Sequence, residues 1–554
     1  MEFIEKTLGQ VIGDLAATRP NALAFQFADR DYRRTWKEFD EETTAVAKGF
    51  MALGVKKNEK ISMWATNTPE WMITLFAAAK IGAVFVTVNT NYKSFELEYL
   101  LSQSDTKVLV MMQGFKDSNY VNIVNGLVPD LPASSDGKVE SERLPELKRV
   151  VFSGLGDVPQ GYLDFNKLIE IGKSVSDEEY LKRYNSLSNE DIVNMQYTSG
   201  TTGFPKGVML THRNIINNGK CIGDGMNFGY DDRLLICVPF FHCFGLVLAV
   251  MASITHGTAM VPIDHYSPIP VMKAIDKWKC TAIHGVPTMY IAMLENPHFA
   301  EYDFSSLRTG IMAGSPCPVE VMKQVVDKMN MKEIVIVFGQ TEASPGCTMT
   351  TTHDSLEKRV ATVGKSFPGV ECRIIDPETG KEQPRGVPGE FCARGYNIMK
   401  GYYKMPEATA QAIDKDGWLH SGDLCTEDED GYFKVVGRIK DMIIRGGENI
   451  YPKEIEEFLY TLPQISDVQV VGVPSKQYGE EVMAFIILKK GETMTEEEVK
   501  AAVKANMARH KVPSYICFVE KFPETASGKI QKFKLREQAL EILKLHDAAN
   551  IETA

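Results

Sequence analysis

Residues 60–65 read KISMWA, residues 69–81 read PEWMITLFAAAKI, and residues 83–88 read AVFVTV. The first and third segments are short apolar runs, and the second has the length and periodicity of a helix. This order predicts a β-α-β unit whose strands run parallel and are buried on both faces. Comparable apolar runs recur at residues 107–111, 234–239, 259–262 and 334–337. The sequence therefore predicts an α/β fold with largely parallel sheets.

The pattern changes near residue 372, where short apolar segments begin to alternate with turns at residues 376–380 and 385–389 that contain Gly and Pro. This alternation predicts a β-rich subdomain. Beyond Gly437, helix-like and strand-like segments alternate on a smaller scale, which predicts a compact α+β unit. We therefore predict a large N-terminal domain over residues 1–436 with its β-rich subdomain at about 372–436, a hinge over 437–440, and a small C-terminal domain over 441–554.

The composition excludes several classes of protein. The 554 residues are 44% hydrophobic and 24% charged, which is typical of a globular chain and not of a disordered one. The net charge of -12 argues against binding of nucleic acid, because such proteins carry a basic surface. The ten cysteines include no C-x-x-C pair, so the sequence indicates neither a disulfide framework nor a zinc knuckle, and it favours the cytoplasm.

The sequence also lacks membrane signals. Its beginning has no basic start followed by the apolar run of a signal peptide. The most apolar stretches, at residues 71–88 and 244–254, are interrupted or shorter than the ~20 residues that a spanning helix needs. We expect no integral membrane segment. Peripheral contact with a bilayer stays open, and so does the choice between a monomer and a homodimer.

The strongest chemical signal is at residues 197–207, which read YTSGTTGFPKG. Glycines, hydroxyl side chains and one lysine at this density present N–H, O–H and ammonium donors to an anion, so the segment predicts a phosphate-binding loop. It is not a Walker A loop, because Pro205 precedes Lys206 and Gly207 follows it. The alternative for any single segment of this kind is a glycine-rich turn without a ligand.

Four further segments appear in order along the chain: FGQTE at 338–342, GWLHSGD at 417–423, GRIKD at 437–441 and SGKIQK at 527–532. Taken singly, each would also fit a surface charge, a turn or a basic strip. Together with the loop they resemble the adenylate-forming (AMP-binding) superfamily, which includes acyl-CoA synthetases, peptide-synthetase adenylation domains and firefly luciferase. The C-terminal segments look most like the medium-chain fatty acyl-CoA synthetases, so we expect an acyl-CoA synthetase-like fold with a mobile C-terminal domain.

The resemblance assigns roles to individual residues. Glu342 is expected to bind Mg²⁺ together with the ATP phosphates, Asp423 to bind the ribose hydroxyls, and Lys440 to act as the hinge. The expected catalytic residues are Lys529, His242, Thr198 and Glu342. The expected ATP and AMP contacts are Thr198, Ser199, Gly200, Thr201, Thr202, Gly203, Lys206, Gly314, Ser315, Gly339, Gln340, Thr341, Asp423, Arg438 and Lys529.

The resemblance also indicates where the acid and coenzyme A bind. The expected acyl pocket consists of Phe241, His242, His284, Gly285, Val286, Ala313, Gly314 and Gly339, and the expected coenzyme A contacts are Arg445, Gly446 and Gly447. The segment FFHCFG at 240–245 lacks the Asp that holds an amino-acid substrate, and Gly339 replaces the Trp of acetate-specific enzymes. Aliphatic, aromatic and alicyclic acids stay open. His242 is interpreted as a gate or a carboxylate contact, with a core histidine as the alternative.

The implied activity is that of an AMP-forming carboxylate:CoA ligase, an acid-thiol ligase. Such an enzyme uses ATP, Mg²⁺ and coenzyme A: the acid is activated as acyl-AMP with release of pyrophosphate, and the acyl group then passes to coenzyme A with release of AMP. Two alternatives remain: transfer of the acyl group to the pantetheine of a carrier protein, and an inactive nucleotide-binding scaffold.

Overall fold

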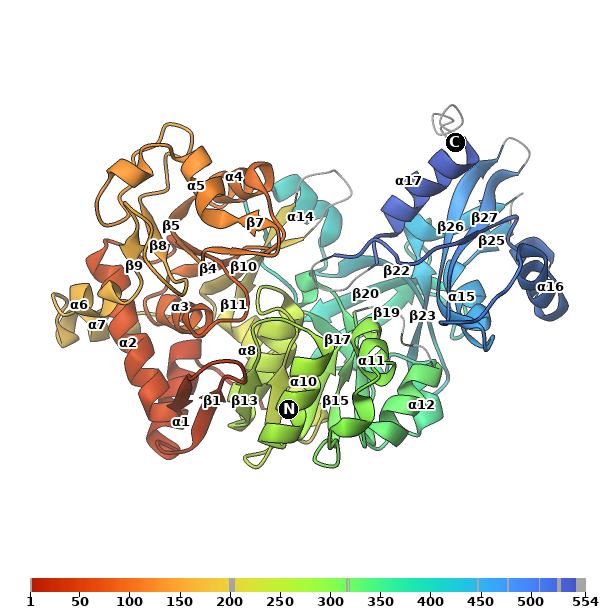
Figure 1. The fold of residues 1–554 in the computed structure, drawn as a ribbon, viewed down its shortest axis with the longest axis horizontal. Coiled ribbons are helices and arrows are strands. Elements are labelled where there is room, and N and C mark those ends of the chain that lie inside the picture. Colours follow the sequence, from red (N-terminus) through yellow and green to blue (C-terminus); the bar gives the residue numbers. More distant parts are fainter. Residues whose placement is uncertain are drawn as a thin grey trace.

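The computed structural model describes residues 2–198, 205–314, 317, 319–445, 448–475, 478–507, 509–525 and 530–544 (Figure 1). The predicted β-α-β unit is present as β3 (Lys60–Trp64), α3 (Pro69–Lys80) and β4 (Val84–Thr87). The two strands pair in parallel with Ile61 opposite Phe85. The Thr68 hydroxyl caps α3 by accepting from the amide of Trp71, and Pro69 occupies the first turn, so the helix begins where local chemistry favours it.

This unit belongs to an eight-stranded sheet in the order β21-β11-β10-β4-β3-β5-β8-β9. Its other strands are β5 (Thr106–Met111), β8 (Arg149–Phe152), β9 (Leu163–Asp164), β10 (Ile192–Thr198), β11 (Lys206–Thr211) and β21 (Gly401–Tyr402). β10 is parallel to β4 and antiparallel to β11, so the predicted phosphate-binding loop joins two antiparallel strands. β21 comes from a distant part of the chain and pairs with β11.

A second, nine-stranded sheet has the order β18-β17-β16-β15-β14-β12-β13-β1-β2. Its strands are β1 (Leu23–Gln26), β2 (Arg33–Thr35), β12 (Arg233–Ile236), β13 (Ala259–Pro262), β14 (Ala282–Gly285), β15 (Thr309–Met312), β16 (Glu333–Gly339), β17 (Gly346–Met349) and β18 (Lys365–Ser366). The six central strands from β16 to β1 are parallel, and the outer ones are antiparallel. The α/β class is therefore confirmed, with two mixed sheets.

Helix α8 (His212–Gly225) joins the two sheets, because it contacts β10 and β11 of the first and β17 of the second. Asn218 exchanges two hydrogen bonds with the backbone of Gly346, at 2.8 and 3.0 Å, and this satisfies a buried amide. Gly219 permits close packing, since a Cβ there would lie 2.4 Å from the Cβ of Met251. Met251 ends a π-helix, Phe244–Met251, that is buried throughout.

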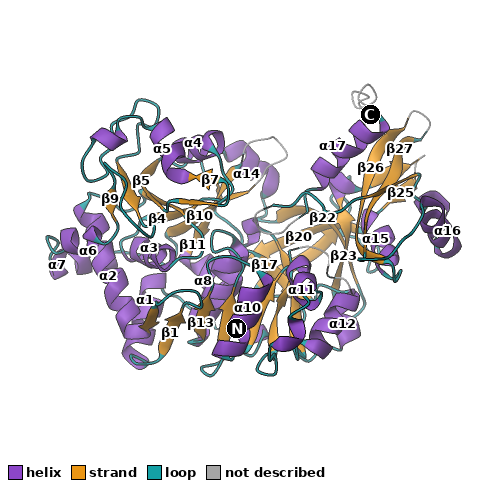
Figure 2. Ribbon diagram, viewed as in Figure 1, coloured by secondary structure: helices purple, strands orange, loops and turns teal. Residues whose placement is uncertain are grey.

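Helices cover both sheets (Figure 2). In the N-terminal part they are α1 (Leu8–Thr18), α2 (Trp36–Ala52), α4 (Ser94–Gln103), α5 (Tyr120–Leu127), α6 (Lys167–Gly172), α7 (Asp177–Asn185), α9 (Ala252–His256), α10 (Pro268–Trp278), α11 (Pro287–Leu294), α12 (Val319–Lys328), α13 (Leu356–Ala361) and α14 (Pro406–Ala412), besides α3 and α8. None of the helices in the described part of the chain is both long and apolar enough to cross a membrane.

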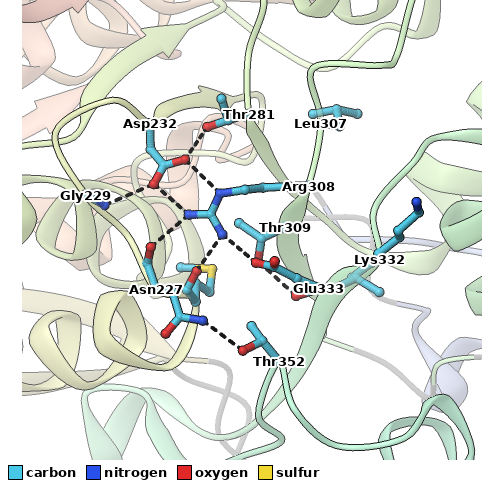
Figure 3. Close-up of polar contacts among 12 residues, drawn as sticks. Asn227, Gly229, Asp232, Thr281, Leu307, Arg308, Thr309, Lys332, Glu333 and Thr352 are labelled. Atoms are coloured by element: carbon cyan, nitrogen blue, oxygen red, sulfur yellow. Dashed lines mark hydrogen bonds and ion pairs between the residues drawn. The ribbon is translucent and has the colours of Figure 1, made fainter.

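An ion-pair network fastens the strand beginnings of the second sheet (Figure 3). Arg308, which precedes β15, donates to both carboxylate oxygens of Asp232 at 3.1 and 2.6 Å and to Glu333 at 2.6 Å. Asp232 precedes β12, and Glu333 begins β16. The network therefore fixes the N-terminal ends of these parallel strands. Binding sites of such sheets lie at the opposite, C-terminal ends of the strands.

The predicted β-rich subdomain is a four-stranded antiparallel sheet in the order β19 (Val370–Ile375), β20 (Gly389–Gly395), β22 (Leu419–Glu427) and β23 (Phe433–Arg438). The C-terminal part, blue in Figure 1, has its own five-stranded sheet of β24 (Ile443–Arg445), β25 (Glu448–Ile450), β26 (Ile465–Ser475), β27 (Gly479–Leu488) and β28 (Tyr515–Phe518). Its helices are α15 (Pro452–Tyr460), α16 (Glu496–Asn506) and α17 (Lys532–Leu543). Helix α15 contacts β23, and Lys453 donates 2.9 Å to the carbonyl of Val435.

Candidate active site

The ends of three neighbouring parallel strands bring together much of the expected acyl pocket. β14, β15 and β16 lie side by side, and they end at Gly285, Met312 and Gly339. The amide of Ala313 donates 3.3 Å to the carbonyl of Gly285. A Cβ at Gly314 would lie 3.1 Å from the side chain of Val286, so these two segments touch. Ser315 lies outside the described residues.

The hairpin of β10 and β11 supplies the two ends of the phosphate-binding loop. Thr198 is paired with Lys206 across the hairpin, so both flank the loop at the same level. Ser199, Gly200, Thr201, Thr202 and Gly203, which were expected to contact phosphate, lie outside the described residues. The hydroxyl of Tyr99 donates 3.0 Å to the carbonyl of Pro205 and holds the second end of the loop against α4.

Glu342 lies beside this hairpin. Its Oε1 accepts from the hydroxyl of Tyr402 at 2.8 Å and lies 3.5 Å from Oγ1 of Thr198. The ammonium of Lys206 lies 4.9 Å from the centre of the Tyr402 ring. Burial and the neighbouring carboxylate raise the pKa of Tyr402 above its ordinary value, so the phenol stays protonated and donates. A carboxylate among hydroxyls next to a phosphate loop fits Mg²⁺, which prefers oxygen ligands.

Tyr402 did not emerge from the sequence. It lies sixty residues beyond Glu342, and no pattern around Gly401 marks it. The structure brings it to the site through the pairing of Tyr402 with Val208 in β11 and through a backbone bond of 2.9 Å from Met399 to the carbonyl of Glu342.

A small cavity joins the FGQTE segment to the four-stranded sheet. Its lining consists of Phe338, Gly339, Gln340, Cys347, Phe391, Ala393, Leu419, Ser421 and Asp423. Gly339 must be a glycine in this backbone, since a Cβ would lie 1.9 Å from the carbonyl oxygen of Pro345. Thr341 follows at the start of a single 3-10 turn, Thr341–Ala343, and is mostly buried. The expected nucleotide residues of the two segments therefore face one cavity or adjoin it.

Asp423 and Arg438 form an ion pair on neighbouring strands. They are register partners in β22 and β23, and Nε of Arg438 lies 2.8 Å from Oδ1 of Asp423. The aspartate side chain is 7% exposed, whereas that of the arginine is 46% exposed. The carboxylate raises the pKa of Arg438. The pair places one acceptor and one cation at the last strand before the expected hinge.

The two histidines of the expected acyl pocket have different surroundings. His242 is half-buried, and its Nδ1 accepts from the amide of Phe244 at 3.1 Å. Phe241, the preceding residue, is also half-buried. His284 is fully buried with the rings of Phe228 and Phe244 nearly parallel to its own, at centroid distances of 6.4 and 6.1 Å, and its Nε2 donates 2.9 Å to the carbonyl of Leu248. Burial lowers the pKa of His284 to about 4, so the ring is neutral at pH 7.

The C-terminal residues are only partly described. Arg445 is 19% exposed; it lies 2.8 Å from the Glu481 carboxylate and donates 2.8 Å to the carbonyl of His510. Its side chain therefore fixes the end of β24, next to Gly446 and Gly447, which lie outside the described residues. Lys440 is exposed in the turn Ile439–Asp441.

Lys529 also lies outside the described residues, but the chain on both sides of it is anchored. Glu524 and Ile530 form an antiparallel bridge, and the amide of Gln531 donates 2.8 Å to the carbonyl of Pro523. Lys532 forms an ion pair of 2.6 Å with the buried carboxylate of Glu456. These contacts fix the two ends of the segment that carries Lys529.

Comparison with known proteins shows the family of the chain. A family model described as AMP-binding enzyme matches residues 14–403, and one described as AMP-binding enzyme C-terminal domain matches residues 454–529. YngI of Bacillus subtilis, which carries a provisional acyl-CoA synthetase name, is 51% identical over 98% of this chain and 99% of its own. The medium-chain acyl-CoA ligase ACSF2 of Rattus norvegicus mitochondria is 40% identical over 98% of this chain and 89% of its own.

Solved structures give the same result. The anthranilate CoA ligase AuaEII in complex with anthranoyl-AMP superposes with a TM-score of 0.84 at 26% identity, covering 98% of both chains. ATP-bound MatB from Rhodopseudomonas palustris superposes with a TM-score of 0.82 at 28% identity, covering 96% of this chain and 99% of its own. The chain therefore belongs to the AMP-binding enzyme family, within which it groups with the acyl-CoA synthetases, the ATP-dependent acid-thiol ligases that form AMP.

Proposed function

We propose that this acid-thiol ligase activates a medium-chain carboxylic acid as acyl-AMP and transfers the acyl group to coenzyme A. The observation that carries the proposal is the position of the Glu342 carboxylate. It lies between the hydroxyl of Tyr402 and that of Thr198, the residue that precedes the predicted phosphate-binding loop. Hydroxyl, carboxylate and ammonium groups converge there from three strands and one turn. Such a set is suited to binding a triphosphate and its cation.

Glu342 and Thr198 would hold Mg²⁺ together with ATP phosphate oxygens. When bound, the ion neutralises charge on those oxygens during displacement of pyrophosphate. Tyr402 keeps the Glu342 carboxylate in place, and Lys206 supplies a positive charge at the second end of the loop. Asp423 is proposed to accept the two ribose hydroxyls, with Arg438 fixing its carboxylate.

In the first half-reaction, a carboxylate oxygen of the acid attacks the α-phosphorus of ATP and pyrophosphate leaves. Negative charge increases on the non-bridging oxygens, and we assign its stabilisation to Lys529. The role of His242 is to contact the reacting carboxylate or to gate the pocket. In the second half-reaction, the sulfur of coenzyme A attacks the acyl carbon. The bond between this carbon and the phosphate oxygen breaks, and AMP leaves with the electron pair of that bond.

The two half-reactions are proposed to use two orientations of the C-terminal domain, residues 441–554, about a hinge at 437–440. The segment after Arg438 is suited to this, since Lys440 lies exposed in a short turn between two sheets. In the second orientation the backbone of Gly446 and Gly447 would face the pantetheine arm. Arg445 was expected to contact coenzyme A directly. We propose instead that its bonds to Glu481 and His510 position the segment that carries these two glycines.

An uncharged tail of medium length is favoured for the acid. Burial keeps His284 neutral, and the rings of Phe228 and Phe244 lie beside it, so this end of the expected pocket is apolar. The 40% identical rat relative is named a medium-chain ligase, whereas the 26% identical structural relative is named for anthranilate. A second candidate function, transfer to a carrier-protein pantetheine, shares the first half-reaction.

The test is pyrophosphate release from ATP and Mg²⁺ with straight-chain acids of increasing length, benzoic acid and cyclohexanecarboxylic acid, with and without coenzyme A. We expect the highest kcat/KM for a medium straight chain, and turnover that requires coenzyme A. A best substrate with a ring would contradict the acid assignment. Release of pyrophosphate without any turnover by coenzyme A would contradict the acceptor.

A further inference from the structure

A group of metal-ligand side chains lies in the four-stranded sheet, outside the set of ATP-site residues described above. Glu390 and Cys392 are two residues apart on β20, and His420 is on the adjacent strand β22. Nδ1 of His420 lies 2.9 Å from Oε2 of Glu390 and 3.6 Å from Sγ of Cys392. The three ligand atoms all lie within 4.8 Å of one another. We propose that these three side chains form a binding site for Zn²⁺.

The separation of the sulfur and nitrogen ligands is close to that of a tetrahedral zinc site. With Zn–S of about 2.3 Å and Zn–N of about 2.0 Å, a tetrahedral angle places sulfur and nitrogen about 3.5 Å apart. The separation of Cys392 and His420 is 3.6 Å. An oxygen and a nitrogen ligand would be about 3.4 Å apart, so the Glu390 carboxylate has to withdraw from His420 by roughly 0.5 Å. The other oxygen of this carboxylate accepts 3.0 Å from the amide of Gly422, so the shift has to keep or replace that bond.

A fourth residue supports the imidazole from its other side. Oδ2 of Asp414 lies 3.6 Å from Nε2 of His420. Oδ1 of the same carboxylate accepts from the amides of Asp416 and Trp418, both at 2.9 Å, so Asp414 is held in a turn. A histidine that binds a metal commonly donates its second N–H to a carboxylate, which fixes the ring and the tautomer. At 3.6 Å the Asp414 carboxylate lies just beyond hydrogen-bond distance of Nε2, so a small shift towards the ring would give His420 this second partner.

Charge and access are also compatible with a divalent ion. Arg373, whose guanidinium lies 3.8 Å from Asp414, contributes one positive charge. With Zn²⁺ bound, this charge and the ion balance the carboxylates of Glu390 and Asp414 and the thiolate of Cys392. Cys392 is fully buried, whereas His420 is 29% and Glu390 is 12% exposed, so solvent reaches the site from the histidine side. A thiolate and an imidazole select Zn²⁺ over Mg²⁺.

The competing arrangement needs no metal. Without a metal, His420 forms a hydrogen bond with the Glu390 carboxylate, and Cys392 is a neutral thiol beside it. The two arrangements differ in the thiol proton, which Zn²⁺ binding releases to solvent. They are distinguished by whether the sulfur of Cys392 bonds to an added ion.

The test uses the full chain, stripped of metal with a chelator and then dialysed. Co²⁺ serves as the spectroscopic probe and Zn²⁺ as the competitor. We expect one equivalent of Co²⁺ to produce a sulfur-to-cobalt charge-transfer band and the visible bands of tetrahedral cobalt, and we expect one equivalent of Zn²⁺ to remove both. Absence of stoichiometric binding, or cobalt bands without the charge-transfer band, would overturn the proposal.

Variants assign the band to the site. Cys392→Ser should abolish the charge-transfer band, and His420→Gln should abolish tetrahedral binding. Cys372→Ser is the matched control: Cys372 pairs with Ala393 across β19 and β20, so it points to the opposite face of the sheet, and the band should persist. Asp414→Asn should retain the band but weaken Zn²⁺ binding by about 10- to 100-fold. A band that survives in Cys392→Ser protein with an unchanged near-ultraviolet circular dichroism spectrum would overturn the assignment.

Discussion

The hydroxyl of Tyr402 donates a 2.8 Å hydrogen bond to Oε1 of Glu342, although the two residues are sixty positions apart and belong to different parts of the N-terminal fold. The bond orients a carboxylate whose other near neighbour is Thr198, at the end of the phosphate-binding loop. Orientation of a single acidic side chain by a buried phenol is therefore a testable element of ATP binding.

We predict that Tyr402→Phe lowers kcat/KM for ATP by roughly 10- to 100-fold, because a hydrogen bond to a charged group contributes about 1.5–3 kcal/mol. Pyrophosphate release measured over a range of Mg²⁺ concentrations should show that the variant requires more Mg²⁺. The control is Tyr403→Phe, whose hydroxyl bonds to Lys60 and Asp105 and not to Glu342. Equal effects of the two substitutions would contradict the role of Tyr402.

Asp423→Asn should raise KM for ATP by roughly 10- to 100-fold and leave KM for the acid unchanged, because the amide loses its charge for Arg438 and accepts at only one position. Steady-state kinetics with each substrate varied in turn will separate the two constants. Glu427→Gln, at the far end of the same strand, is the matched control. A rise in KM for both substrates would indicate damage to the sheet and not to the ribose contact.

Arg308→Ala is expected to lower the free energy of unfolding by about 2 kcal/mol, because it leaves the carboxylate of Asp232, which is 10% exposed, without its cation. The usual cost of breaking a buried pair is reduced here, since Arg308 itself is 30% exposed. Urea denaturation measures the change, with Lys323→Ala on the exposed side of α12 as control. At 25 °C kcat/KM should stay within about twofold of the parent, because the network lies at the N-terminal ends of the strands and the candidate site at their C-terminal ends. A larger loss would show that the network also affects the site.

Acid should destabilise the fold partly through His284. Its pKa of about 4 in the folded chain lies below the ordinary value of 6.5, so the unfolded chain binds a proton over this range that the folded chain does not. The stability it confers is complete above pH 6.5 and decreases as the pH falls towards 4. Between pH 7 and pH 5 the loss is about 2 kcal/mol.

His284→Gln retains a donor for the carbonyl of Leu248 and removes the titrating ring. The variant should therefore lose about 2 kcal/mol less stability than the parent between pH 7 and pH 5, as measured by urea unfolding at both values. Buried His212, with a pKa of about 3, keeps part of the acid dependence in both proteins. His298→Gln on the surface is the control; a parallel pH profile for His284→Gln and the parent would contradict the prediction.

Local patterns predicted the elements well but not their arrangement. The β-α-β unit at residues 60–88 is where periodicity placed it, because a buried helix and two buried strands leave a direct trace in the sequence. The same kind of run at 334–337 belongs to another sheet, which no single run can indicate. The π-helix Phe244–Met251 was also not predicted, since its sequence is apolar at every position and has no helical period.

The site shows the same division. The phosphate-binding loop, Glu342 and Asp423 were marked by motifs, because each needs particular residue types in a fixed order. Tyr402 depends on strand register, and Arg445 depends on Glu481 and His510 from later parts of the chain. The group of Glu390, Cys392 and His420 escaped because its ligands come from two strands that only the sheet brings together. What the sequence did not reveal was which segments contact one another in the folded chain.

The protonation of Cys243 has a consequence for an enzyme that makes thioesters. Cys243 is fully buried next to the half-buried His242, and burial together with the Glu342 carboxylate raises the pKa of its thiol. Thiolates, and not thiols, are the reactive nucleophiles. Burial therefore keeps Cys243 in the unreactive thiol form, although it directly follows His242, a residue of the expected acyl pocket.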